Sequence, residues 1–104
     1  MDYRIVRFSE FARQDLIEGR RFYEEHSPDL GTYFFDSLLA DIDSLYWFAG
    51  IHSREFGAYR MLAKRFPYSI YYLLDENEVL IVAILDQRRS PLYHYMMLEN
   101  RTHP

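Results

Sequence analysis

The chain has 104 residues, a formal net charge of −4 and no cysteine. This length fits one domain that folds without disulfides. The lack of cysteine excludes a disulfide framework, a cysteine-based zinc site and a cysteine nucleophile. Because nonspecific affinity for nucleic acid rises with the number of phosphates neutralised, this acidic chain is not a general nucleic-acid binder. No apolar run approaches the ~20 residues of a membrane helix and no secretory signal opens the chain, so a soluble cytoplasmic protein is expected.

The first elements predicted are a strand and an amphipathic helix. Residues 3–8 are rich in β-branched and aromatic side chains, which favours a strand, and Ser9 can cap a helix that follows it. Over residues 10–26, apolar residues recur at spacings of three and four, which predicts the helix. Its apolar stripe contains Gly19, which costs up to about 1 kcal/mol relative to Ala in a helix. This glycine either permits close approach to another element or is simply tolerated.

A second helix is predicted to begin at Pro28. Proline suits the first helical position and Ser27 can cap it. Apolar residues then recur every three or four positions between residues 30 and 45, and Gly50 can end the helix. The two helices therefore form an antiparallel hairpin whose acidic outer face is a solvated surface. That face carries Glu18, Glu24, Glu25, Asp36 and Asp43.

The second half of the chain predicts three strands. Residues 51–57 form a connection, residues 59–65 alternate as a strand does, and Pro67 interrupts the pattern before a second strand over 68–74. Residues 75–77 form a polar turn. The run over 79–85 is apolar on both faces, which predicts a central, covered strand.

The resulting element order, β-α-α-β-β-β, predicts an α+β fold. The last three strands form an antiparallel meander, and the N-terminal helical hairpin packs on one face of this antiparallel sheet. The other face stays partly open. Residues 1–104 then form a single domain, in which the weakly patterned residues 92–104 are a tail or a short extra element.

Five pieces of the sequence, in this order, resemble the RelE/ParE superfamily of toxins from type II toxin–antitoxin systems. They are the pair Phe22-Tyr23, residues 27–31 (SPDLG), 57–60 (GAYR), 66–72 (FPYSIYY) and 82–91 (VAILDQRRSP). The match extends over roughly residues 3–91. The amino-acid sequence of the predicted strands is more similar to the ParE-like, plasmid-stabilisation branch of the superfamily.

This resemblance implies a toxin that is neutralised by a small cognate antitoxin. ParE-like members inhibit DNA gyrase and are not nucleases, whereas RelE-like members cleave messenger RNA in the ribosome. The expected function is therefore a toxin that binds a cellular target such as DNA gyrase. The alternatives are a ribosome-dependent mRNA endoribonuclease, which would make the protein an enzyme, and a solitary, non-toxic interaction module. The partners implied are the antitoxin, gyrase or ribosome and mRNA, and a second copy in a homodimer free of antitoxin.

Basic residues near the ends of the predicted strands form the candidate site for a target or an anion. They are Arg60, Lys64, Arg65, Arg88 and Arg89. For the nuclease alternative, the resemblance implies catalysis by Arg60, Lys64, Arg88 and Tyr93, where the cations would stabilise the charge of a phosphorane-like transition state. Strict alternation places Arg60 and Lys64 on one strand face and Arg65 on the other. The simpler alternative is that these side chains are exposed strand ends paired with acids, as Arg88 would be with the nearby Asp86.

Other functional residue types carry weaker signals. The four histidines have no metal-ligand spacing, and no phosphate loop or nucleophile elbow occurs, so no metal or cofactor is expected. Tyr68, Tyr71 and Tyr72 could stack on nucleic-acid bases. Since Tyr71 and Tyr72 point to opposite faces of a strand, at least one of them belongs to the core.

Overall fold

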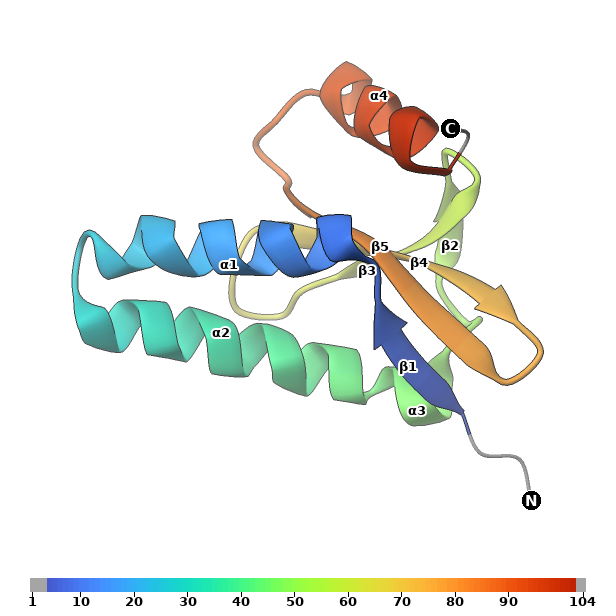
Figure 1. Cartoon of the computed structure of the whole chain (residues 1–104), viewed down its shortest axis with the longest axis horizontal. Helices are drawn as coiled ribbons and strands as arrows, with labels where there is room; N and C mark the ends of the chain where they lie inside the picture. Colours follow the sequence, from blue (N-terminus) through green and yellow to red (C-terminus); the bar gives the residue numbers. More distant parts are fainter. Residues whose placement is uncertain (1–3, 103–104) are drawn as a thin grey trace.

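The structure is a computed structural model that describes residues 4–102. Along the chain, these residues form β1 (Ile5–Phe8), α1 (Glu10–Glu24), α2 (Pro28–Asp43), α3 (Leu45–Phe48), β2 (Ser53–Glu55), β3 (Ala58–Leu62), β4 (Tyr68–Asp75), β5 (Glu78–Asp86) and α4 (Pro91–Thr102). Figure 1 shows α1 and α2 side by side on one side of the sheet and α4 apart from them. The predicted first strand began at residue 3, which lies outside the described residues.

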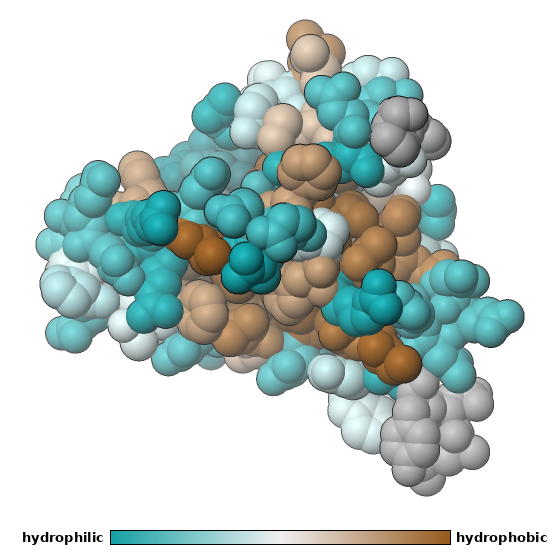
Figure 2. All heavy atoms as spheres, viewed as in Figure 1, coloured by the Kyte–Doolittle hydropathy of each residue, from teal (hydrophilic) through white to brown (hydrophobic). Residues whose placement is uncertain are grey.

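Serine caps fix the start of both hairpin helices. Ser9 Oγ accepts the N–H of Ala12 at 3.1 Å, and Ser27 Oγ accepts the N–H of Leu30 at 3.2 Å. Both caps were predicted, because a serine side chain satisfies a helical N–H that has no partner within the helix. The acidic side chains of the outer face are exposed as expected, and Figure 2 shows polar side chains over much of the hairpin surface.

The sheet confirms the predicted fold class and meander, and it contains one more strand. The strand order is β1-β5-β4-β3-β2, with antiparallel pairing from β2 to β5 and parallel pairing between β1 and β5. The prediction of a plain connection over residues 51–57 is wrong, because β2 lies there. Its three residues, Ser-Arg-Glu, carry no apolar alternation, so an exposed edge strand of this kind leaves little pattern in the sequence.

The strand predicted over residues 59–65 is shorter than expected. β3 ends at Leu62, and the N–H of Lys64 donates to Asp41 Oδ2 at the end of α2, at 3.0 Å. This bond draws the chain away from the sheet, and Phe66 then enters the core. Lys64 and Arg65 therefore lie in a loop, where strand alternation does not determine their direction.

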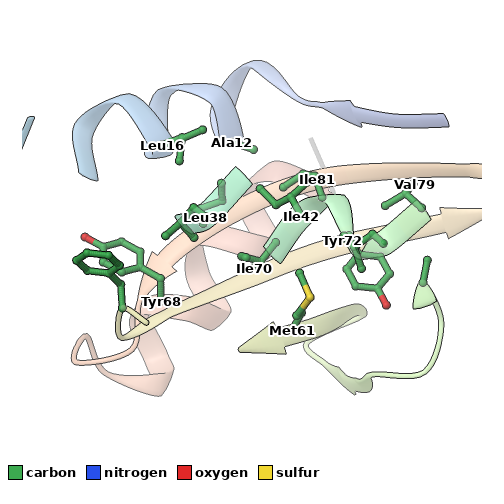
Figure 3. Packing of buried hydrophobic residues seen from close by; sticks show 14 of the residues in the cluster. Ala12, Leu16, Leu38, Ile42, Met61, Tyr68, Ile70, Tyr72, Val79 and Ile81 are labelled. Atoms are coloured by element: carbon green, nitrogen blue, oxygen red, sulfur yellow. The ribbon is translucent and has the colours of Figure 1, made fainter. Parts of the chain in front are cut away.

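The main core lies between the helical hairpin and the sheet. Figure 3 shows Leu16 of α1 and Leu38 and Ile42 of α2 facing the sheet residues. At Gly19, a Cβ atom would lie 2.6 Å from Cζ of Phe34, whose ring is fully buried. Of the two explanations for this glycine, the structure supports close approach, because any larger residue would overlap the Phe34 ring.

The other face of the sheet is partly covered by α4. Leu98 of this helix is fully buried in a second cluster that includes Tyr71 of β4 and Val82 of β5. The weakly patterned C-terminal residues thus form a helix as far as residue 102, which is one of the alternatives that the sequence left open. Figure 1 shows α4 on the side of the sheet away from α2.

A buried ion pair closes the outer edge of β5. β1 pairs only with residues 78–81, so the second half of this edge has no strand beside it. Instead, Asp15 of α1 accepts the N–H of Ile84 at 2.9 Å, and Arg101 of α4 donates to the carbonyl oxygen of Val82 at 3.1 Å. The two side chains also form a bidentate pair with N–O distances of 2.6 and 2.9 Å, and both are less than a tenth exposed. Together they connect α1, β5 and α4.

We expect Gly19→Ala to lower the free energy of unfolding by about 1–3 kcal/mol, because overpacking against Phe34 outweighs the gain in helix propensity. Chemical denaturation of the wild type and the variant measures this change. In a Phe34→Leu background the same substitution should cost less. An equal cost in both backgrounds would show that Phe34 is not the obstacle.

We expect Asp15→Asn to lower the free energy of unfolding by about 3 kcal/mol, because it leaves the Arg101 charge buried without a counter-ion. Arg13→Gln, which removes an exposed ion pair with Glu10 on the same helix, is the matched control and should leave the denaturation midpoint unchanged. Adding Arg101→Met to Asp15→Asn should recover part of the loss. Equal midpoints for the Asp15 and Arg13 variants would contradict this account of the edge.

Candidate anion-binding site at the end of the sheet

Arg88 is neutralised locally by Asp86. Its Nε donates to Asp86 Oδ1 at 2.9 Å, its Nη2 donates to Oδ2 at 2.7 Å, and its backbone N–H also binds Oδ1 at 2.8 Å. Hydrogen bonds from Arg88 hold the pKa of Asp86 below its usual value, and the same contacts raise the pKa of Arg88. The pairing predicted as the simpler alternative is therefore present, and this guanidinium has little free charge to offer an anion.

Arg89 is positioned by the first turn of α4. Its guanidinium carbon lies 3.9 Å from the centre of the Tyr93 ring, a cation–π contact that leaves the guanidinium edges free to donate. The backbone N–H of Tyr93 donates to Ser90 Oγ at 3.1 Å, which fixes the turn that carries both residues. The ring of Tyr93 thus holds the guanidinium group of Arg89 in place.

Arg60 reaches the same region from the middle of β3. Its Nε donates to Ser69 Oγ on β4 at 3.0 Å, and its Nη1 lies 3.9 Å from Glu55 on β2. Arg60 and Arg89 both line a pocket of about 190 Å³, whose other lining residues are Glu55, Phe56, Tyr71, Gln87, Pro91 and His94. Two of the five predicted cations therefore meet, with one carboxylate beside them.

His94 forms the base of this pocket together with Tyr71. Nε2 of His94 lies 2.8 Å from the carbonyl oxygen of Asp86, and Nδ1 lies 2.8 Å from the hydroxyl of Tyr71. A carbonyl oxygen only accepts hydrogen bonds, so Nε2 carries a proton, and in the neutral ring the Tyr71 hydroxyl donates to Nδ1. Burial raises the pKa of Tyr71, while the positive charge of Arg60 opposes this shift. Both side chains are almost fully buried.

The sequence pattern did not predict a structural role for His94, although a signal was available. His94 and Leu98 are spaced i, i+4, which places both on one face of a helix, and these two residues are the buried residues of α4. This buried face was not predicted because the apolar periodicity of residues 92–104 is weak. The contact with Tyr71 spans 23 positions, so only the folded chain brings the two side chains together.

The remaining predicted residues do not join this pocket. Lys64 borders a second hollow, between α3 and β3, which Arg60 also lines. Tyr93 borders a third hollow of about 320 Å³, between α1 and the end of β5. Arg65 and Arg88 are exposed. Of the four candidate catalytic residues, Arg60 and Lys64 thus share one hollow, whereas Tyr93 lines another and Arg88 lies on open surface.

The three tyrosines named as base-stacking candidates are all buried. Tyr71 packs under α4, whereas Tyr68 and Tyr72 belong to the core below the hairpin, so the predicted opposite directions of Tyr71 and Tyr72 are observed. Burial raises the pKa of Tyr68 to about 12.

Among residues 4–102, no group of three His, Asp or Glu side chains is placed to hold a metal ion. No helix in this part of the chain is long and apolar enough to span a membrane.

A family model described as the ParE toxin of the type II toxin–antitoxin system, parDE, matches residues 6–91. The chain belongs to the ParE toxin family. A solved structure titled "Chromosomal ParDE TA system from P. aeruginosa" has a similar fold, with a TM-score of 0.71 at 18% identity, and the similarity covers 79% of this chain and 94% of that chain. No curated protein matches the sequence. In this ParE-family chain, α4 lies almost wholly beyond the matched residues, so His94 and Arg101 are outside them.

We expect Tyr71→Phe to lower the free energy of unfolding by about 1–3 kcal/mol, because it leaves the buried Nδ1 of His94 without a donor. Tyr95→Phe removes an exposed hydroxyl from α4 and serves as the control, with no measurable change. Nitrogen NMR shifts of the His94 ring in the wild type should show the proton on Nε2. A proton on Nδ1 would contradict the hydrogen-bond chain.

Proposed function

We propose that this ParE-family chain is the toxin of a two-protein module, that a small antitoxin neutralises it, and that it acts by binding DNA gyrase. Family membership supports the toxin role. The choice of gyrase follows the ParE-like branch, whose members inhibit that enzyme. The observation that carries the proposal of binding, rather than RNA cleavage, is that no single hollow holds all four candidate catalytic residues: Arg60 and Lys64 share one hollow, Tyr93 lines another, and Arg88 is exposed.

RNA cleavage requires an acid and a base within hydrogen-bond reach of the reacting atoms, and cations placed where charge develops. Both ring nitrogens of His94 are engaged in hydrogen bonds within the protein, one with the hydroxyl of Tyr71 and one with the carbonyl oxygen of Asp86. Arg88 is paired with Asp86. The net charge of −4 also disfavours affinity for ribosomal RNA. Binding a protein target needs none of these groups to be free for proton transfer.

The pocket between Arg60 and Arg89 offers such a target an anchoring point. Two guanidinium groups face one carboxylate, Glu55, which leaves a net positive pocket. Its volume of about 190 Å³ suits one carboxylate side chain of the target, and guanidinium groups bind carboxylates through two parallel hydrogen bonds. Glu55, 3.9 Å from Arg60, holds that guanidinium only loosely. We therefore place target recognition at these two arginines.

Inducible expression in a bacterial host tests the toxin role. The expected result is growth arrest that co-expression of the neighbouring small reading frame relieves, since an antitoxin gene adjoins its toxin gene in such modules. Purified protein should inhibit gyrase supercoiling in vitro, and primer extension should show intact cellular messages. Normal growth at high soluble expression would contradict the toxin role. Cleaved messages with active gyrase would instead indicate the nuclease alternative.

Arg60→Gln and Arg89→Gln should each weaken gyrase inhibition by at least about tenfold, the loss expected when one charge-assisted contact is removed. Arg21→Gln is the matched control, because Arg21 is an exposed cation on α1 that does not line the pocket. This variant should inhibit gyrase as the wild type does. Thermal denaturation shows whether each variant is folded. Equal inhibition by all four proteins would place target binding elsewhere.

A further inference from the structure

A hollow of about 320 Å³ lies between α1 and the second half of β5, where β1 no longer pairs with that strand. One face of α1 forms a wall of this hollow, because four of its lining residues are spaced three and four apart along the helix. They are Asp15, Glu18, Gly19 and Phe22. Residues 84–86 of β5 lie on the sheet side. The volume is at the lower end of the range for small-molecule sites, about 300–1,000 Å³, so the hollow can hold a small ligand.

Tyr68 reaches this hollow from inside the core. The residue is only 7% exposed, yet it lines the hollow. Figure 3 shows its hydroxyl directed away from the other labelled core side chains. Within the range 4–102, this hydroxyl forms no hydrogen bond, and burial raises its pKa to about 12. The hydroxyl therefore keeps its proton at neutral pH and is a free donor. An almost buried polar group of this kind normally has its hydrogen bond completed by water or a ligand.

Three carboxylates line the hollow, and two of them are already paired. Asp15 forms the buried ion pair with Arg101. Asp86 binds Arg88 at 2.7 Å. Glu18 is exposed and forms no ion pair with another described residue. The negative charge that remains available to a ligand is therefore on Glu18.

Arg89 supplies a free positive charge at the same hollow. Its guanidinium lies over the ring of Tyr93 and is in no ion pair with the residues that the structure describes. Arg89 also lines the pocket that contains Arg60, so the two sites share this guanidinium. The hollow thus offers one free carboxylate from α1 and one free guanidinium from the segment before α4.

The backbone of β5 adds one acceptor and one donor. The N–H of Ile84 points to the outer edge, where Asp15 binds it at 2.9 Å. The N–H of Gln87 points to the other edge and donates to the carbonyl oxygen of Pro67 at 2.7 Å. In an antiparallel strand the N–H and C=O groups of one residue share an edge, and successive residues alternate between edges. The carbonyl oxygen of Ile84 and the N–H of Asp86 therefore face the edge at which the hollow lies.

We propose that this hollow binds a free α-amino acid with an aromatic or large aliphatic side chain. Its ammonium group donates to Glu18 and to the carbonyl oxygen of Ile84. Its carboxylate accepts from the guanidinium of Arg89 and from the hydroxyl of Tyr68, and its side chain packs beside Phe22. A zwitterion with an apolar body uses both free charges of the hollow. The site is independent of the proposed toxin activity, so its test needs neither gyrase nor an antitoxin.

Simple ions fit this hollow less well than a zwitterion does. A small anion at Arg89 would lie in the same hollow as the carboxylates of Glu18 and Asp86, and a small cation at Glu18 would share it with the guanidinium. Like charges close together in a partly enclosed site repel each other. Phe22 and Leu85 also give the hollow an apolar lining that an inorganic ion does not use.

Titration of the purified chain with L-phenylalanine, followed by nitrogen–proton NMR spectra, tests the site. Saturable shifts of the backbone N–H signals of Ile84 and Asp86 are expected, with a dissociation constant of about 1 mM or below. Phenethylamine lacks the carboxylate and 3-phenylpropionate lacks the amine, so each should bind at least about fivefold more weakly. The absence of a saturable shift at these residues up to about 10 mM, or equal binding by either analogue, would overturn the proposal.

Variants test each contact against the ligand that lacks the matching group. Glu18→Gln should raise the dissociation constant of L-phenylalanine at least about fivefold but should not weaken 3-phenylpropionate, which has no amine. Arg89→Gln should likewise weaken L-phenylalanine but not phenethylamine. Glu25→Gln is the matched control, because Glu25 is an exposed acid just beyond α1 that does not line the hollow. Thermal denaturation shows whether each variant is folded. Equal affinity of the Glu18 and Glu25 variants for L-phenylalanine, or an equal loss for L-phenylalanine and 3-phenylpropionate in Glu18→Gln, would overturn the assignment.

Discussion

The arrangement of this protein depends on the ion pair between Asp15 and Arg101. β5 pairs with β4 in the meander and contacts both α1 and α4. β1, however, pairs with only the first half of its outer edge. The two charged side chains satisfy the backbone of Val82 and Ile84 in place of a strand and neutralise each other while buried. Breaking such a pair leaves an uncompensated charge in the interior. The contact thereby fixes α4 to α1, and the position of α4 in turn places His94 and Arg89 at the end of the sheet.

Arg60 lies between two hollows of the surface. It lines the pocket under α4 as well as the hollow beside α3, since β3 separates the two. The pocket is bounded by strands, by the first turn of α4 and by the hydrogen-bonded pair of Tyr71 and His94, which suits recognition of a single charged group.

Sequence patterns predicted elements well where a local rule governed the outcome. The caps at Ser9 and Ser27, the apolar stripes of α1 and α2 and the fully apolar β5 follow from contacts within a few residues, and all were found. The errors have non-local causes. β2 is a polar edge strand defined by its pairing with β3, and β3 ends early because Asp41, more than twenty positions before Lys64, binds the backbone there. The role of Gly19 was left undecided because its reason, the Phe34 ring, lies on another helix.

By itself, the sequence determined the fold class, the order of the main elements and the family. These depend on periodicity, capping and short motifs, each of which involves residues that are close together in the sequence. It also supplied Asp86 as the neighbour that neutralises Arg88, two positions away. Only the tertiary structure decided which cations share a pocket, because Arg60 and Arg89 lie on separate elements and meet only when α4 docks. The same holds for His94 and Arg101, whose partners Tyr71 and Asp15 are 23 and 86 positions away. Contacts at such separations are specified by packing of the whole chain, and no local pattern encodes them.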